Sequence, residues 1–219
     1  VILRSYKMLR LYMMRHGETV WNTERRYQGM TDIELSQTGI KQAECAAKRF
    51  ENIEIDKIYC SPLKRAMATA KPIAEAKKLD IIPEENFREI HFGEWEGMTV
   101  PELKAKYGDT YMNFIKNPHL YDFPGEGNIS NVINRLKPSL DRIIENESGN
   151  ILIVSHGGII RLMIMYIMGL DNSWFTKMWI NNTAISIIEI KDDRRLMLTV
   201  NDSAHLSDIG QNESNFLKP

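Results

Sequence analysis

The chain has little cysteine, no long uninterrupted hydrophobic run and almost no net charge, and each scarcity excludes a class of protein. Its two cysteines, Cys45 and Cys60, are too few among 219 residues for the disulfide framework of a small secreted protein. They fall in a helical and a strand-like context, so we expect buried, reduced thiols in a cytoplasmic protein. Neither Cys-x-x-Cys nor His-Glu-x-x-His occurs, and we therefore predict no metal and no other cofactor.

The charge distribution argues against nucleic-acid and membrane partners. The 28 Lys and Arg nearly balance the 29 Asp and Glu, for a formal net charge of −1, and the two signs are interspersed. This balance argues against nucleic-acid binding, so any anion site must be local. Residues 1–10 are too short and too charged for a secretory signal or a membrane span, and we expect no membrane association. The chain starts at Val1, and Met8 is our candidate for the native start, which N-terminal sequencing would test.

What is present favours one compact enzyme. Hydrophobic residues make up 43% of the chain, enough for a large core, and no low-complexity linker interrupts it. We therefore expect residues 1–219 to form a single domain. Residues 90–127 are rich in aromatic side chains and lie between two sheet-like regions, so we expect an insertion that covers the active site.

Hydrophobic periodicity predicts alternating strands and helices. Strands are expected at 9–14, 57–60, 81–82 and 151–154, and helices at 38–50, 62–78, 128–146 and 159–168. Residues 183–190 and 195–200 should form a closing hairpin around 191–194. Pro62 is expected in the first turn of its helix, whereas Pro138 should kink or divide its own. This order predicts an α/β fold, a three-layer α/β/α sandwich with a mostly parallel central sheet and ligands at the carboxyl ends of its strands.

Two histidines lie at such strand ends. His16 stands in an Arg-His-Gly-Glu sequence after the first strand, and His156 in a Ser-His-Gly-Gly sequence after the strand at 151–154. A histidine that attacks phosphorus needs a neutral nitrogen aimed in line and donors that already surround the phosphoryl oxygens. Arg15 can supply a forked donor, and a helix that opens at Gly157 can offer backbone N–H groups. The pair indicates phosphate chemistry.

Several separated motifs, in order, resemble the histidine phosphatase superfamily, also called the phosphoglycerate mutase-like fold. The resemblance runs from about residue 9 to the final hairpin. It rests on 11–19, Asn22, Gln28-Gly29, Asp32, Leu35-Ser36, Gly39, Gln42-Ala43, 61–66, Thr69-Ala70, Arg88-Glu89, Phe92-Gly93, 95–97 and 155–158.

The resemblance implies a role for each matching residue. His16 would be the nucleophile that becomes phosphohistidine, and Arg15, Arg65 and His156 would bind the phosphoryl oxygens. Neighbouring guanidinium charge should lower the pKa of His16 and favour its neutral form. Arg65 lies near the start of a predicted helix, where its side chain can turn back toward the strand ends.

The remaining roles belong to the leaving group and to neutral contacts. Glu89 would protonate the leaving oxygen and then activate water, because a bound phosphate dianion should raise the pKa of a nearby carboxyl group. Asn22, Gln28 and Gly157 would complete the substrate contacts. Arginines and His156 would supply the charge, so activity should survive excess chelator.

Hydrolysis is favoured over phosphoryl transfer between substrates. The family's mutases carry a basic motif with a tyrosine just after the acid, whereas this chain has an acidic and aromatic stretch at 90–97 that includes Glu94 and Glu96. We therefore predict a metal-independent phosphomonoesterase. Its sequence near 95–99 is similar to α-ribazole phosphatases and broad-specificity phosphatases, so α-ribazole 5'-phosphate and several small phosphate monoesters are candidate substrates. At 125–128 the chain has Gly-Glu-Gly-Asn, and it lacks the serine that often follows Gly-Glu in the family.

Two other functions stay open at this stage. One is a cofactor-dependent phosphoglycerate mutase, and the other is a catalytically silent module that binds a phosphorylated ligand. The aromatic residues between 99 and 127 suit a pocket for a sizeable, weakly charged leaving group, but helical core spacing explains some of them equally well. The Trp- and Met-containing segment 174–179 could form a homodimer face or a packed edge of the core.

Overall fold

The computed structural model describes residues 8–207 and 209, and its centre is a six-stranded sheet with strand order β3-β2-β4-β1-β5-β6. The strands are β1 (Met8–Arg15), β2 (Lys57–Cys60), β3 (Ile81–Pro83), β4 (Gly149–Ser155), β5 (Ile185–Lys191) and β6 (Arg194–Asp202). The first four strands are parallel, β5 runs antiparallel to β1, and β6 runs antiparallel to β5. The predicted, mostly parallel sheet is confirmed.

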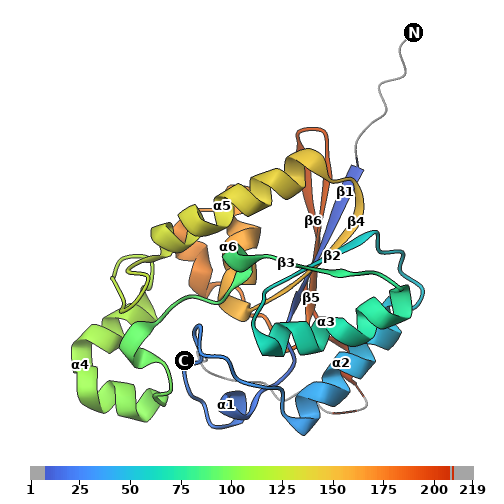
Figure 1. Ribbon diagram of the computed structural model, residues 1–219. Helices are drawn as coiled ribbons and strands as arrows, with labels where there is room; N and C mark the ends of the chain where they lie inside the picture. The colour runs from blue at the N-terminus through green and yellow to red at the C-terminus, as the bar shows by residue number, and fades with distance from the viewer. Residues whose placement is uncertain (1–7, 208, 210–219) are drawn as a thin grey trace.

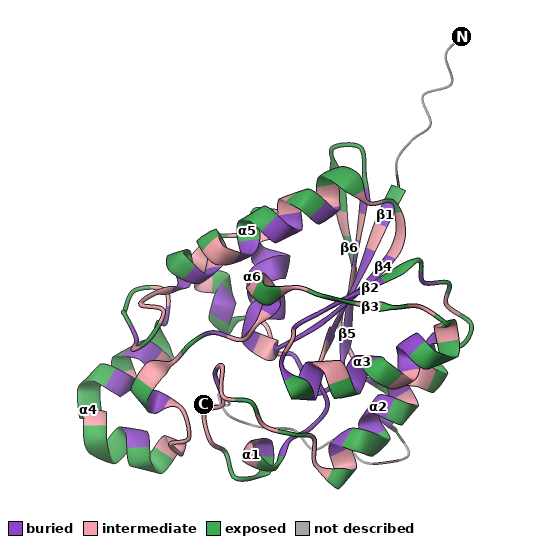
Figure 2. Ribbon diagram, in the orientation of Figure 1, coloured by how far each residue is buried: buried purple, intermediate pink, exposed green. Residues whose placement is uncertain are grey.

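Helices cover both faces of this sheet, which gives three layers (Figure 1). The helices are α1 (Val20–Thr23), α2 (Gln37–Phe50), α3 (Lys64–Lys77), α4 (Val100–Lys116), α5 (Ile129–Asn146) and α6 (Gly157–Met168). Helices α2 and α3 pack on one face, and α5 and α6 on the other. The first layer follows from the amphipathic spacing of α2, and the second from α6, whose side chains are mostly buried (Figure 2).

Alternate side chains along the strands belong to two separate hydrophobic cores, one on each face of the sheet. In β1, Leu11 and Met13 join the core under α5 and α6, whereas Tyr12 and Met14 join the core under α2 and α3. Ile151 and Ile153 of β4 alternate with Leu152 and Val154 in the same way. Successive side chains of a strand point to opposite faces, so a continuously apolar strand must be covered on both. The sandwich is the consequence.

Three details differ from the sequence expectations. Helix α3 begins at Lys64, so Pro62 precedes the helix and does not lie in its first turn. Helix α5 runs unbroken through Pro138, because the packing of its buried face outweighs one lost backbone hydrogen bond. Cys60 is buried as expected, but Cys45 is only half-buried.

The segment 90–127 contains a helix that the pattern did not assign. Thr99 caps α4, and its hydroxyl and Glu102 form a reciprocal capping box. Gly108 interrupts the helical geometry with a φ of 49°, which a residue with a side chain adopts only at a cost. In Figure 1, α4 lies beside the α/β/α layers, on the side of α5.

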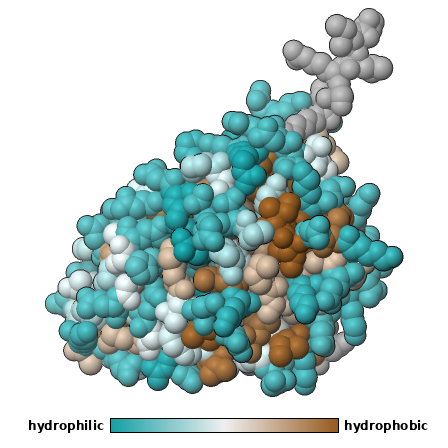
Figure 3. All heavy atoms as spheres, in the orientation of Figure 1, coloured by the Kyte–Doolittle hydropathy of each residue, from teal (hydrophilic) through white to brown (hydrophobic). Residues whose placement is uncertain are grey.

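The face shown in Figure 3 is largely hydrophilic, with several separate hydrophobic patches. In the part of the chain that the model describes, no helix is long and apolar enough to cross a membrane. The expectations about a native start and about residues 1–7 lie outside the described residues.

Candidate active site

Three neighbouring strands bring two histidines and a serine together at one edge of the sheet. His16 follows β1, His156 follows β4 and Ser61 follows β2. Because β4 lies between β1 and β2 and parallel to both, the carboxyl ends of the three strands are adjacent. The ring centroids of His16 and His156 are 5.2 Å apart, and Nε2 of His156 lies 2.8 Å from Oγ of Ser61. The two histidines singled out in the sequence therefore share one site.

The His16 ring is held in the tautomer that a nucleophile requires. His16 is 2% exposed, and its Nδ1 lies 2.6 Å from the carbonyl oxygen of Gly17. A carbonyl oxygen only accepts, so Nδ1 carries the proton and Nε2 keeps its lone pair. Burial, followed by the charges of Arg65 and Arg15, holds the pKa of His16 well below its usual range. The ring is therefore neutral at pH 7.

Two arginines flank this ring, Arg65 fully buried and Arg15 half-buried, and backbone carbonyls orient both. Arg65 donates to the carbonyl oxygens of Thr31 and Gly29, each at 2.7 Å, and Arg15 donates to that of Ile180 at 2.7 Å. Burial lowers the pKa of each arginine to about 10, which leaves both charged at pH 7. The forks are fixed before a ligand arrives, so an incoming phosphoryl group meets preorganised charge.

His156 lies behind the pocket rather than in its wall. It is fully buried, and its side chain is absent from the pocket lining. Burial, followed by the charge of Arg65, holds the pKa of His156 well below its usual range, so this ring is neutral as well. Its Nδ1 has no hydrogen-bond partner among the described residues. Direct contact between His156 and a phosphoryl oxygen stays a prediction.

Glu89 lines the same pocket as the two arginines, and its carboxylate lies against the first turn of α6. Its carboxylate accepts from the backbone N–H of Ile90 at 3.0 Å and from that of Gly158 at 3.4 Å. A Cβ on Gly158 would stand 2.6 Å from Oε1 of Glu89, so a side chain at this position would push the carboxylate away from the helix. The structure therefore explains the second glycine of the Gly-Gly sequence, which the motif alone did not.

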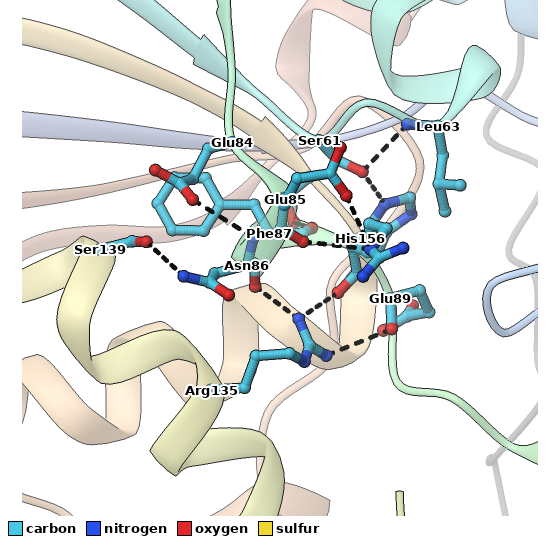
Figure 4. A network of polar contacts seen from close by, with 12 residues as sticks. Ser61, Leu63, Glu84, Glu85, Asn86, Phe87, Glu89, Arg135, Ser139 and His156 are labelled. Atoms are coloured by element: carbon cyan, nitrogen blue, oxygen red, sulfur yellow. Dashed lines mark hydrogen bonds and ion pairs between the residues drawn. The ribbon is translucent and has the colours of Figure 1, made fainter. Parts of the chain in front are cut away.

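Arg135 of α5 fixes the backbone around Glu89 (Figure 4). Its guanidinium donates to three backbone carbonyls on this segment, those of Asn86, Arg88 and Glu89. The carboxylate of Glu126 completes the arrangement, with Nε of Arg135 at 2.6 Å from its Oε1. Both side chains are about 15% exposed, at 16% and 14%. This partly buried pair was missed by the sequence reasoning, because nothing local in the sequence links Arg135 to Glu89.

The pocket wall contains most of the residues that the sequence indicated. Arg15, His16, Arg65 and Glu89 all line it, and so do Asn22, Gln28 and Gly157. The lining also includes apolar side chains, among them those of Phe92, Phe114, Ile115, Pro118, Phe175, Trp179 and Ile180. The aromatic residues near 90–127 therefore divide between two roles, since Trp95 and Tyr111 are buried in the core.

The two acidic residues that argued against a second phosphate lie outside the pocket lining. Glu94 is exposed and pairs with Lys106 at 3.8 Å. The carboxylate of Glu96 accepts from the backbone N–H groups of Met30, Thr31 and Phe92, at 3.0 to 3.1 Å. Neither carboxylate therefore lies in the pocket wall, although the charge of Glu96 still acts on Arg65.

The segment 174–179 is divided as well. Trp174 is 39% exposed, Phe175 is buried, and Trp179 lies in the pocket wall. Two of its six residues, Phe175 and Trp179, thus line the pocket, and a homodimer face on the exposed residues stays a prediction.

Arg161 is one of the residues in the pocket wall that the sequence reasoning missed, together with Arg26 and Tyr27. It lies on α6, four residues after Gly157, so that the two share a helix face. Helical side chains lean toward the N-terminus of their helix, and Nε of Arg161 donates to the carbonyl oxygen of Gly157 at 3.2 Å. That spacing from the phosphate-binding motif was the available signal.

Comparisons with known proteins agree with this geometry. The model of the histidine phosphatase superfamily (branch 1) matches residues 11–203. Phosphoserine phosphatase 1 of Hydrogenobacter thermophilus is 36% identical over 202 residues, which cover 92% of this chain and 96% of that protein.

Two solved structures share the fold. The phosphoserine phosphatase of Entamoeba histolytica, in complex with 3-phosphoglyceric acid, has a TM-score of 0.80 and 32% identity over 90% of this chain and 99% of that one. A putative α-ribazole-5'-P phosphatase of Escherichia coli has a TM-score of 0.81 and 26% identity over 89% of this chain and 96% of that one. With such relatives and this site, the protein is a phosphoric monoester hydrolase. The chain belongs to the histidine phosphatase superfamily, branch 1.

Proposed function

We propose that the protein hydrolyses small phosphate monoesters through a phosphohistidine on Nε2 of His16, without a metal. The observation that carries this proposal is the tautomer of His16, whose Nδ1 is committed to the Gly17 carbonyl at 2.6 Å. Only Nε2 is left to attack, and the charges of Arg65 and Arg15 act on this ring.

The reaction has two steps. Nε2 of His16 attacks phosphorus, the bond to the ester oxygen breaks, and Glu89 gives that oxygen its proton. Water then attacks the phosphohistidine, Glu89 accepts a proton from the water, and the electron pair of the breaking P–N bond returns to Nε2. Arg15 and Arg65 stabilise the charge on the phosphoryl oxygens throughout, in the manner of preorganised donors.

The segment 90–127 provides the wall for the leaving group in this scheme. Phe92 and Phe114 belong to it and face the pocket, so they suit the carbon skeleton of a substrate. Phosphoserine and α-ribazole 5'-phosphate are both candidates, since relatives are named for each. If the protein releases phosphate from neither compound in a substrate panel, both candidate substrates are excluded.

Trapping the covalent intermediate tests the proposal. Wild-type protein incubated with a ³²P-labelled monoester and quenched should carry label that is stable to alkali and lost in acid. His16→Ala should carry none and should lose activity by about 10⁴-fold or more. His91→Ala is the matched control, because the His91 side chain is 48% exposed. Label on His16→Ala, or none on the wild type during turnover, would refute the nucleophile.

Two further measurements separate the rivals. Activity in excess chelator should be unchanged, and a loss that added metal restores would contradict the metal-independent scheme. The mutase alternative requires interconversion of phosphoglycerates when the protein is primed with the bisphosphate. Phosphate release without interconversion would favour the hydrolase.

Location and assembly are proposals of the same kind. Cys45 and Cys60 are both free thiols, and burial raises the pKa of Cys60, which suits a reduced cytoplasmic protein. Cell fractionation tests the location. Sedimentation velocity tests the homodimer.

A further inference from the structure

The peptide that joins His16 to Gly17 is held by a side chain on each of its two sides. Nδ2 of Asn182 donates to the carbonyl oxygen of His16 at 2.9 Å. On the other side, the N–H of Gly17 donates to Oγ1 of Thr69 at 2.9 Å. All four residues are buried. Because a peptide unit is planar, these two bonds together fix the rotation of the plane about the line between its two Cα atoms.

The orientation of this plane bears directly on the nucleophile. Nδ1 of His16 donates to the carbonyl oxygen of Gly17 at 2.6 Å, and this bond is what leaves Nε2 free to attack. Glycine has a wider choice of backbone conformations than any other residue. The carbonyl that fixes the ring therefore belongs to an intrinsically adaptable residue, and its direction depends on how the preceding peptide is held.

Thr69 connects this peptide to the helix that carries Arg65. Its hydroxyl donates to the carbonyl oxygen of Arg65, one turn earlier on α3, at 2.6 Å. A hydroxyl has a single proton and two lone pairs, so Oγ1 of Thr69 can still accept from the N–H of Gly17. Neither Thr69 nor Asn182 lines the pocket. Both therefore act on the site without touching a substrate.

Asn182 reaches the peptide from the segment that precedes β5. The N–H of the next residue, Thr183, donates to the carbonyl oxygen of Arg15 at 3.0 Å and lies 3.4 Å from that of His16, so Asn182 makes the shorter bond to His16. Thr183 is buried and has a φ of 53°, which a β-branched residue adopts only at a cost. Such strain persists where the surrounding structure enforces it. The packing thus holds Asn182 against His16 in spite of the strain.

The pairing of β1 with β4 ends just before this peptide. The N–H of His16 donates to the carbonyl oxygen of Ser155 at 2.9 Å, and the His16–Gly17 peptide comes next in the chain. In-line attack requires Nε2 to be aimed at phosphorus, and a misplacement of about 1 Å costs roughly 10²-fold in rate. The aim of the ring therefore depends on contacts that the strand pairing does not provide.

We propose that Thr69 and Asn182 are positioning residues that aim Nε2 of His16 at phosphorus by clamping the His16–Gly17 peptide. This inference rests on the proposed function, in which His16 is the nucleophile. It adds to that function two residues that act through the peptide plane.

Two inhibitors separate the aim of His16 from the binding of phosphate. Vanadate mimics the transition state by taking a fifth ligand from the nucleophile, whereas inorganic phosphate needs only the surrounding donors. In Thr69→Val and in Asn182→Ala, we expect kcat/KM for p-nitrophenyl phosphate to fall about 10- to 100-fold and the Ki of vanadate to rise by a similar factor. The Ki of inorganic phosphate should stay within about twofold of the wild-type value.

Two control variants accompany these measurements. Thr69→Ser keeps the hydroxyl and should stay within about threefold of the wild type in all three quantities. Ser186→Ala is the matched control, because Ser186 is buried and its Oγ accepts from the backbone N–H of Asn201 at 3.1 Å, outside the pocket lining. It should change neither Ki. Thermal melting establishes that each variant is folded, and if one of the two clamp variants is not, the other decides.

The two Ki values distinguish aim from a general structural role. Equal rises for vanadate and phosphate would show that the variants only disturb the phosphate-binding donors. An unchanged Ki of vanadate would show that His16 keeps its aim without the clamp. Either result would overturn the proposal, and so would a Thr69→Ser variant as impaired as Thr69→Val.

The double variant tests whether both side chains act on one plane. Two bonds to one rigid unit are coupled, so the loss of kcat/KM in the double variant should be smaller than the product of the two single losses. Losses that multiply would show two independent supports and would overturn the shared clamp.

The outcomes also separate this inference from the proposed function. If the wild type carries phosphohistidine on His16 and both clamp variants behave like Ser186→Ala, only the clamp fails. If the wild type carries no label during turnover, and vanadate inhibits it no more strongly than phosphate does, the proposed function itself fails.

Discussion

In the proposed scheme the pocket has two ends. The phosphate end lies at the carboxyl ends of β1, β2 and β4. The leaving-group end is formed by α6, the 3-10 turn Asn172–Thr176 and the segment 90–127. At the phosphate end, the backbone N–H of His16 donates to the carbonyl oxygen of Ser155 at 2.9 Å, and that of Ser61 to Val154 at 2.9 Å. The backbone hydrogen bonds of the sheet therefore continue up to His16 and Ser61 in the site.

The leaving-group end is held by side chains instead. Arg135 and Glu126 brace the backbone of Glu89 from α5 and from the loop before it, and Phe175 stacks on Arg161. A ladder fixes geometry through the backbone of any sequence, while a brace depends on particular residues. The phosphate end should thus be constant among related proteins, and the leaving-group end should vary with the substrate.

Replacing Glu89 with a residue that cannot donate a proton should cause the largest loss of kcat/KM that distinguishes the two ends. For phosphoserine, whose alkoxide leaves poorly, Glu89→Gln should lower kcat/KM by about 10²- to 10³-fold. For p-nitrophenyl phosphate, whose leaving group needs no proton, the loss should be about tenfold or less. Steady-state kinetics with both substrates measure this. Glu85→Gln is the control, since Glu85 is exposed and pairs with Arg88, and equal losses for both substrates would refute an acid role for Glu89.

The histidines of the phosphate end predict how stability depends on pH. Their pKa values are lowered by burial, so below about pH 6.5 the unfolded chain binds protons that the folded chain does not. Stability should be complete above that pH and should decline as pH falls. Each histidine contributes up to about 1.4 kcal/mol per pH unit to the slope of the unfolding free energy.

Urea unfolding at pH 7.0, 6.0 and 5.5 measures that slope. His156→Gln should reduce it by about one proton, because the glutamine does not titrate. An unchanged slope in this variant would mean that His156 is charged in the folded protein.

The sequence could predict the phosphate end almost completely. Apolar runs set the strands, a parallel sheet aligns their carboxyl ends, and His16, Arg15 and Arg65 meet there as expected. These residues are fixed by local motifs next to regular elements. His156 is the partial exception, because burial behind the wall depends on packing that no motif encodes.

The leaving-group end could be predicted only in outline. Aromatic residues at 90–127 indicated a pocket wall, but the division between Phe92 in the wall and Trp95 in the core depends on the tertiary packing of α4. Arg135 acts across the fold on Glu89, 46 residues away in the sequence. A long-range contact of this kind leaves no periodic or local signal, whereas Arg161 could have been found from its spacing to Gly157.

Glu96 tests whether the two ends are independent, and it carries the smallest expected effect. It belongs to the leaving-group segment, yet its carboxylate binds the backbone of Met30 and Thr31, next to the carbonyl that orients Arg65. In Glu96→Gln, the amide would present N–H groups to backbone donors, so the loop should shift and misplace Arg65. We expect about a tenfold loss of kcat/KM with every monoester, including p-nitrophenyl phosphate. Glu94→Gln, at the exposed neighbour, should stay within about twofold, and identical kinetics for the two variants would show that the segment does not act on the phosphate end.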